Sequence, residues 1–290
     1  MWNSWADRDI IQKLRSIAQK HNDWFYLKQV KSAKDRDRME NEELLTSLVF
    51  LEYYKDRADP RKLLDVYQKT DRINARIGDK VWVSQLLQDV AEKEQVKSDL
   101  LNAIKGAEAF VKKLKTVLLD ADKTKDELWE YLRTELDNIF RGGKDSRRFK
   151  RTLQDYYVLW QFLGSLNLEM VKFNRLTMKQ EMKALFKYIK NIPEEEHLEN
   201  KGFQKYESLL RSFKKDYKKA DRKLALSEAQ KLAMIKGQKN MSALSGAPMF
   251  LGDDIEVDHS HALATGGKDE LENLQMTHQD ENRAKGSRAS

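Results

Sequence analysis

The sequence predicts a mainly α-helical protein with a large all-α domain over residues 1–235 and a small mixed module over residues 236–290. Apolar side chains before residue 235 recur at the helical period over long stretches, and only Pro60 and Pro193 interrupt them. The segment from Gly237 to Gly286 differs, because it holds half of the glycines and three of the five histidines. An irregular module rich in ligand-type side chains is where we expect the chemistry.

Composition limits the class of protein. Charged residues make up 35% of the chain and hydrophobic residues 40%, which is typical of a soluble helical protein. The net charge of +7 permits nucleic-acid binding without requiring it. The absence of cysteine fits a reducing compartment, and we expect a cytoplasmic protein. No apolar run approaches the length of a membrane span, and the first residues lack the pattern of a signal peptide.

Apolar periodicity predicts a series of helices in the first domain. The Asp59-Pro60 pair is a helix-start signal, and Gly106 marks a point where the longest helix would break. Linkers are expected at residues 142–145 and 191–193, where glycine, asparagine and proline gather. The predicted helices cover residues 10–17, 44–54, 63–77, 83–119, 125–140, 146–166, 177–189 and 202–223.

The helical domain carries no convincing catalytic group. His21 and His197 stand alone, and isolated histidines are usually structural. All six tryptophans lie at or before Trp160, where they favour a packed core over a base-stacking platform.

Basic side chains gather in the last predicted helix of this domain. They form either an ordinary solvated face or a surface that tracks DNA phosphates towards the module. Residues 147–151 form a second, weaker basic patch. The candidates for nucleic-acid binding in the helix are Lys214, Lys215, Lys218, Lys219 and Arg222, flanked by Arg211 and Lys223.

The C-terminal module is predicted to contain two strands, a loop and a helix. Residues 255–257 alternate apolar and polar after a turn at Gly252, and residues 247–257 would form a hairpin. Residues 274–276 predict another short strand. Thr277 is a suitable N-cap for a helix over residues 278–285, which would end at Gly286.

Three side chains of the module point to phosphodiester chemistry. Asp258 and His259 end a predicted strand, and Asn282 lies on the helix expected to pack across it. Carboxylate and amide oxygens are hard ligands suited to Mg²⁺ or Mn²⁺. An imidazole can take a proton from water near neutral pH, beside a metal ion that polarises the phosphoryl oxygen.

These residues resemble the motif of the HNH endonucleases, a family of ββα-metal nucleases. The resemblance covers about residues 240–288. It implies that His259 is the general base, that Asp258 and Asn282 hold the metal, and that Asn273 braces the loop and orients the histidine. The matching segments are Glu256-Val-Asp-His259, Gly266-Gly267, Glu272-Asn273-Leu-Gln and Glu281-Asn282-Arg-Ala-Lys285-Gly.

The module departs from many members of that family. Relatives often carry two Cys-x-x-Cys pairs that bind a structural zinc ion, whereas this chain has no cysteine. A Cys-ligated zinc site is therefore excluded, and packing and hydrogen bonds must hold the module together. The Ile-Ile-Pro that often follows the Asp-His pair is also replaced, by Ser260-His261-Ala262. The positions that match the cysteines are Ser242, Ser245, His278 and Glu281.

The sequence thus predicts a metal-dependent DNA endonuclease, with Arg283 and Lys285 as further phosphate contacts. The segments Asn22-Asp23-Trp24-Phe25 and Asn41-Glu42-Glu43-Leu44-Leu45-Thr46-Ser47-Leu48 of the helical domain resemble the C-terminal part of proteins that join a ParB-like, GmrSD-type domain to an HNH module. That resemblance implies restriction or anti-phage defence, with a nucleotide-binding domain or partner subunit beyond this chain. The alternatives are a non-catalytic nucleic-acid-binding or scaffold protein with a degenerate module, and an enzyme acting on RNA.

Overall fold

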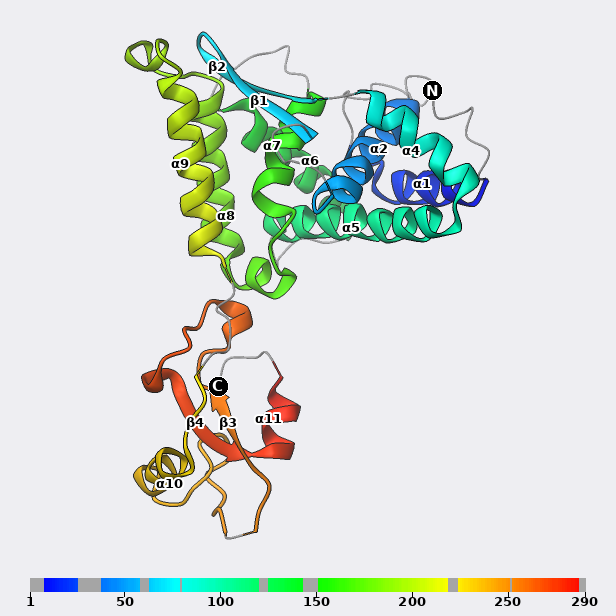
Figure 1. Ribbon diagram of the computed structural model, residues 1–290. Helices are drawn as coiled ribbons and strands as arrows, with labels where there is room; N and C mark the ends of the chain where they lie inside the picture. The colour runs from blue at the N-terminus through cyan, green and yellow to red at the C-terminus, as the bar shows by residue number, and fades with distance from the viewer. Residues whose placement is uncertain are drawn as a thin grey trace. The chain divides into compact units, whose positions relative to one another are not determined.

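The computed structural model describes residues 8–25, 38–57, 63–78, 80–119, 125–142, 151–218, 224–250 and 252–286. These residues fold into two compact units (Figure 1). The first unit comprises Met1–Ser165 with Arg175–Phe213, and the second comprises Leu166–Asn174 with Lys214–Ser290. The division of the chain at residue 235 remains a prediction. No helix in the described ranges is long and apolar enough to cross a membrane.

Helices dominate the first unit. The longest, α5, packs against α1, α2, α4, α6 and α7. Its buried face carries Leu100, Ile104, Phe110 and Leu114, which repeat at helical spacing and are shielded from solvent. The helices are α1 (Arg8–His21), α2 (Arg38–Tyr54), α4 (Lys80–Glu92), α5 (Glu94–Leu118), α6 (Lys125–Arg141), α7 (Leu153–Leu163), α8 (Leu168–Ile189) and α9 (Lys201–Asp216), with a 3₁₀ turn at Glu194–Glu196. The first residues of α8 and the last residues of α9 belong to the second unit.

The predicted helix over residues 83–119 is interrupted at a different place from the one expected. Lys93 separates α4 from α5 and has extended backbone angles, with φ −130° and ψ 109°. Gly106 instead lies inside α5, where a Cβ atom would come within 2.5 Å of Glu52 Oε2. The glycine therefore permits close packing of α5 against α2 and does not break the helix.

The predicted helix over residues 63–77 is wrong. This segment forms an antiparallel hairpin of β1 (Leu64–Lys69) and β2 (Arg72–Ile77). Burial in β2 alternates, because Ile73 and Ala75 face inward while Arg72 and Arg76 are exposed. Thr70 reverses the chain with a φ of 49°. Alternating burial with β-branched and aromatic side chains favoured the strand over the helix.

Several side chains noted in the sequence have structural roles in this unit. Trp24 is fully buried in the core. Burial lowers the pKa of His21 to about 4, and His197 Nε2 lies 2.8 Å from the carbonyl oxygen of Ile192. Arg151, assigned to the weaker basic patch, is buried and pairs with Asp137 at 2.7 Å. It is therefore unavailable to nucleic acid, while residues 147, 148 and 150 lie outside the described residues.

The second unit contains a small sheet with a helix across it. Strands β3 (Ile255–His259) and β4 (Leu274–His278) pair antiparallel, with Asp258 opposite Gln275 and His259 opposite Leu274. Helix α11 (Gln279–Lys285) follows β4 directly and packs on both strands. Two 3₁₀ turns, Leu263–Thr265 and Leu271–Asn273, lie in the loop between the strands.

Two local predictions in this unit need correction. The expected hairpin over residues 247–257 does not form, since β3 pairs with β4 and only an isolated bridge joins Met241 to Pro248 upstream. The N-cap of α11 is His278, whereas Thr277 is fully buried within β4. The predicted strand at residues 274–276 and the helix ending at Gly286 are both present.

Helix α10 (Glu228–Gly237) leads into the module and packs near β4. Just after it, the side-chain amide of Gln238 pairs with the backbone of Met276 in β4. Gln238 Nε2 donates to the Met276 carbonyl at 2.9 Å, and the Met276 amide donates to Gln238 Oε1 at 2.8 Å. The Met276 carbonyl also accepts from the backbone amide of Ala243 at 3.1 Å, so Gln238 and Ala243 together bond the outer backbone groups at the centre of β4.

Candidate active site

The candidate site lies where β3 ends beneath α11. Successive side chains of a strand point to opposite faces of the sheet. The contacts of Asp258 and His259 follow that rule: Asp258 meets side chains from β4 and α11, whereas His259 meets the loop between the strands. The end of β3 therefore presents a carboxylate and an imidazole to two different neighbourhoods.

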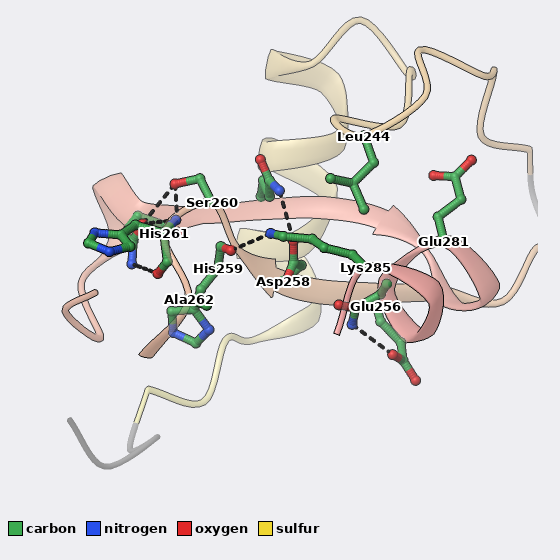
Figure 2. Close-up of polar contacts among 12 residues, drawn as sticks. Leu244, Glu256, Asp258, His259, Ser260, His261, Ala262, Glu281 and Lys285 are labelled. Atoms are coloured by element: carbon green, nitrogen blue, oxygen red, sulfur yellow. Dashed lines mark hydrogen bonds and ion pairs between the residues drawn. The ribbon is translucent and has the colours of Figure 1, made fainter. Parts of the chain in front are cut away.

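Asp258 is held by two donors on one oxygen. Its Oδ2 accepts hydrogen bonds from Gln275 Nε2 at 2.8 Å and from Lys285 Nζ at 2.7 Å. Lys285 also donates to the carbonyl oxygen of His259 at 2.7 Å, so its ammonium lies between the two residues (Figure 2). The other oxygen, Asp258 Oδ1, accepts no hydrogen bond among the described residues. Asp258 therefore keeps one oxygen for a further ligand.

Asn282 is oriented by Glu256 on the neighbouring strand. Its Nδ2 donates to Glu256 Oε2 at 3.0 Å, and Gln279 Nε2 donates to the other oxygen of Glu256 at 2.7 Å. Because the amide nitrogen is engaged, the carbonyl oxygen Oδ1 of Asn282 remains as a potential ligand. Glu256 was part of the sequence motif but had no predicted role, and the structure places it against Asn282.

A divalent cation fits the donors at this site. The described residues contain no cluster of three His, Cys, Asp or Glu side chains able to hold a metal ion. Asp258 Oδ1 and Asn282 Oδ1 are nevertheless hard oxygen donors without protein hydrogen bonds in the described ranges. Mg²⁺ commonly uses one or two protein ligands and completes its octahedron with water and phosphate oxygens. The donor chemistry therefore suits Mg²⁺ or Mn²⁺.

His259 is buried against a carboxylate that the sequence did not single out. His259 Nε2 lies 2.8 Å from Asp269 Oδ1, and the two side chains are only 8% and 9% exposed. The other oxygen of Asp269 accepts the backbone amide of Leu224 at 2.8 Å. The only sequence signal was an acidic residue in the loop after Gly266-Gly267, which is ordinary turn composition.

Asn273 fastens the loop that follows β3. Its Oδ1 accepts from the His261 amide at 2.8 Å and from Ser260 Oγ at 2.7 Å, while its Nδ2 donates to the carbonyls of His261 and Lys268 at 2.9 and 2.8 Å. These four bonds occupy the amide completely. In the described structure Asn273 therefore braces the loop, and the His259 ring makes its hydrogen bond with the Asp269 carboxylate instead.

The two glycines of the loop meet different demands. Gly266 has a φ of +105°, a conformation that favours glycine. Gly267 lies so close to the preceding chain that an added Cβ atom would be 2.0 Å from the carbonyl oxygen of His261. Gly266 thus allows the chain to turn, and Gly267 allows it to pass close to the backbone of His261.

Three of the four positions that match zinc-binding cysteines form a hydrogen-bonded cluster. Ser242 Oγ and Ser245 Oγ each donate to one oxygen of Glu281, both at 2.5 Å. The two hydroxyls hold the pKa of the Glu281 carboxyl below its usual range. At the fourth position, His278 Nδ1 lies 4.0 Å from Asp253 Oδ2. The carboxylate of Glu281 thus joins α11 to the segment before β3 that contains Ser242 and Ser245.

The residues predicted to contact nucleic acid differ in their exposure to solvent. Lys285 is 6% exposed and engaged with Asp258, whereas Arg283 on the same helix is exposed. Lys214, Lys215 and Lys218 are exposed, but α9 ends at Asp216, so Lys218 does not continue its helical face. Lysines four residues apart repel one another in a helix, which disfavours an extension. Lys219 and Arg222 lie outside the described residues.

Comparison with known proteins gives one match. Residues 246–288 match the family model described as HNH endonuclease. No curated protein and no solved structure matches the chain. The matched segment contains β3, the braced loop, β4 and α11, and with them Asp258, His259 and Asn282.

Proposed function

Because residues 246–288 form an HNH endonuclease domain, we propose that this protein is a metal-dependent endonuclease that hydrolyses DNA phosphodiester bonds. The observation that carries the proposal is the arrangement at the end of β3. Asp258 has a carboxylate oxygen and Asn282 an amide oxygen without a hydrogen bond in the described structure. His259, which carries the imidazole, directly follows Asp258 in the chain.

His259 is the proposed general base. Its imidazole takes a proton from a water molecule, and the resulting hydroxide oxygen bonds to phosphorus. The bond from phosphorus to the leaving sugar oxygen breaks, and solvent returns a proton to that oxygen. The carboxylate of Asp269 lies against the other side of the ring and stabilises the imidazolium that forms.

Asp258 and Asn282 are the proposed metal ligands, through the two oxygens left open by their hydrogen bonds. A bound Mg²⁺ or Mn²⁺ would polarise the phosphoryl oxygen and neutralise charge on the leaving oxygen. Glu256 supports the site by fixing the amide of Asn282. Lys285 neutralises Asp258, and its ammonium is suited to bind a phosphate oxygen of the substrate in exchange.

Further cations would hold the DNA backbone. Arg283, Lys214, Lys215 and Lys218 are exposed and suited to phosphate contacts. Lys219 and Arg222 are proposed on the sequence alone. Asn273 supports catalysis indirectly, since it braces the loop beside His259.

Restriction or anti-phage defence is the biological role we propose, with the helical domain of residues 1–235 positioning the module of residues 236–290. This role rests on the faint resemblance of the helical domain. Its test is phage plating on cells that express the wild type or His259→Ala, in which defence should be lost with the variant.

The enzymatic proposal is tested by plasmid cleavage with Mg²⁺, Mn²⁺ or EDTA. The wild type should nick or linearise DNA only with a divalent ion, and His259→Ala should abolish cleavage while leaving DNA affinity nearly unchanged. His197→Ala is the matched control, because it removes a histidine of the helical unit with a structural contact. Wild-type cleavage rates in His259→Ala would refute the assigned base.

The second candidate is a non-catalytic nucleic-acid-binding or scaffold protein. The buried pair of Lys285 with Asp258 favours it, because the lysine already neutralises the proposed metal ligand. Calorimetric titration with Mg²⁺ and Mn²⁺ separates the two functions. Absence of metal binding and of cleavage, with DNA binding retained, would support the second. The same cleavage assay with RNA identifies a ribonuclease.

A further inference from the structure

The carboxylate of Asp269 is fixed at both oxygens. Oδ1 lies 2.8 Å from His259 Nε2, and Oδ2 accepts the backbone amide of Leu224 at 2.8 Å. Leu224 belongs to the segment that precedes α10, far from the loop in sequence. A carboxylate held from two sides keeps its position while its hydrogen-bond partner changes charge, which is what a positioning group requires.

The contact decides which nitrogen of His259 carries the proton. An ionised carboxylate accepts hydrogen bonds and cannot donate them, so Nε2 must be the protonated nitrogen. The lone pair then resides on Nδ1. Both side chains are more than nine-tenths buried, so water competes little for either partner.

We propose that Asp269 is the positioning residue of His259, holding the imidazole in the Nε2–H tautomer with Nδ1 free to accept a proton from water. The kinetic consequence rests on the proposed nuclease function, whereas the tautomer does not. Asn273 does not compete for this role, because in the described structure its side-chain amide bonds to Ser260, His261 and Lys268.

The carboxylates of Asp258 and Asp269 therefore have different contacts and different proposed roles. Asp258, the neighbour of His259 in the chain, makes its contacts with Gln275 and Lys285. Asp269, ten residues later, contacts the ring itself. Loss of Asp269 should impair the chemical step and leave the groups that hold metal and substrate in place.

The test combines histidine nitrogen NMR with cleavage kinetics on the full chain. Long-range ¹H–¹⁵N correlations near pH 8, where an ordinary imidazole is neutral, distinguish the two tautomers, and His259→Ala assigns the signal. The variant is Asp269→Asn, which removes the charge and keeps the size. Glu270→Gln is the matched control, because it removes an exposed carboxylate from the adjacent position.

The wild type should show the Nε2–H tautomer, and Asp269→Asn should lose it. Asp269→Asn should also lower kcat by about 10- to 100-fold with KM within about twofold, while Glu270→Gln matches the wild type. An Nδ1–H tautomer in the wild type overturns the proposal, as does Asp269→Asn that keeps both the tautomer and kcat.

The remaining outcomes are also decisive. If the folded wild type cleaves nothing, the nuclease function fails, and the spectra of wild type and Asp269→Asn alone decide whether Asp269 holds the ring. If Asp269→Asn does not fold, the wild-type spectrum decides, since Nε2–H supports the proposal and Nδ1–H overturns it.

Discussion

Lys285 Nζ lies 2.7 Å from Asp258 Oδ2, and the two side chains are 6% and 10% exposed. The pair is also tied to the backbone, since Lys285 donates to the carbonyl oxygen of His259. Burying a carboxylate without a cation is costly, so the lysine neutralises the residue best suited to bind metal. In the proposed site, the lysine and the metal would therefore act on the same carboxylate.

Lys285→Met should destabilise the protein and increase its response to metal. Removing one partner of a buried ion pair costs about 3 kcal/mol of unfolding free energy, because the other charge is left uncompensated. A divalent ion would restore compensation at Asp258. Thermal unfolding in EDTA and with increasing Mg²⁺ should show a lower melting temperature in EDTA and a larger rise with Mg²⁺ than in the wild type.

Arg283→Met is the control for this prediction, because Arg283 is an exposed cation on the same helix. Its effect on stability should stay within about 0.5 kcal/mol. If Mg²⁺ raised the melting temperature of Lys285→Met and of the wild type equally, the lysine and the metal would not share Asp258.

Glu281→Gln should destabilise the protein at neutral pH and have little effect in acid. Hydrogen bonds from Ser242 and Ser245 lower the pKa of Glu281 in the folded state. The ionised carboxylate therefore adds stability above its unfolded pKa, and this contribution is lost as the pH falls through the folded value. Urea unfolding at neutral pH should give a loss of about 1 kcal/mol, which shrinks towards low pH.

Glu272→Gln supplies the comparison, since Glu272 is an exposed carboxylate of the same module. Its difference from the wild type should be small at every pH. A Glu281→Gln effect that grows as the medium becomes more acidic would contradict the assigned role of the Ser242–Ser245–Glu281 cluster.

Gly267→Ala should disrupt the braced loop. The added Cβ atom would lie 2.0 Å from the carbonyl oxygen of His261, so the backbone must move. We expect a loss of about 2 kcal/mol or more by thermal unfolding, together with reduced cleavage. Gly237→Ala is the control, because a Cβ atom there meets nothing within 4 Å. If Gly267→Ala left the thermal stability nearly unchanged, the loop backbone would be able to shift and accommodate the added Cβ atom, which would contradict this prediction.

Short-range patterns predicted the local elements of the module well. Residues 255–257 alternate and lie in β3, and the helix that ends before Gly286 is α11. Pairing was harder, because turn residues near Gly252 favoured a hairpin with the preceding segment. The real partner of β3 is β4, beyond the loop that Asn273 braces, and only the folded loop brings the two strands together.

The missed features depend on contacts that leave no periodic signal. Residues 63–77 contain apolar side chains whose spacing suits a helix as well as a strand, and packing selected the β1–β2 hairpin. Asp269 looked like any loop aspartate until the fold placed it against His259. Asp258 and Asn282, by contrast, could be singled out from the sequence, because they belong to a motif with fixed local spacing.

The amide of Gln238 has a consequence for how the module behaves in a crowded solution. A two-stranded sheet exposes backbone donors and acceptors that invite strands from other molecules. At Met276 the amide is bonded to Gln238, and the carbonyl is bonded to Gln238 and to the amide of Ala243, so an incoming strand would first have to displace both. Gln238 and Ala243 thereby block the pairing of another strand at this position of the sheet beneath the candidate site.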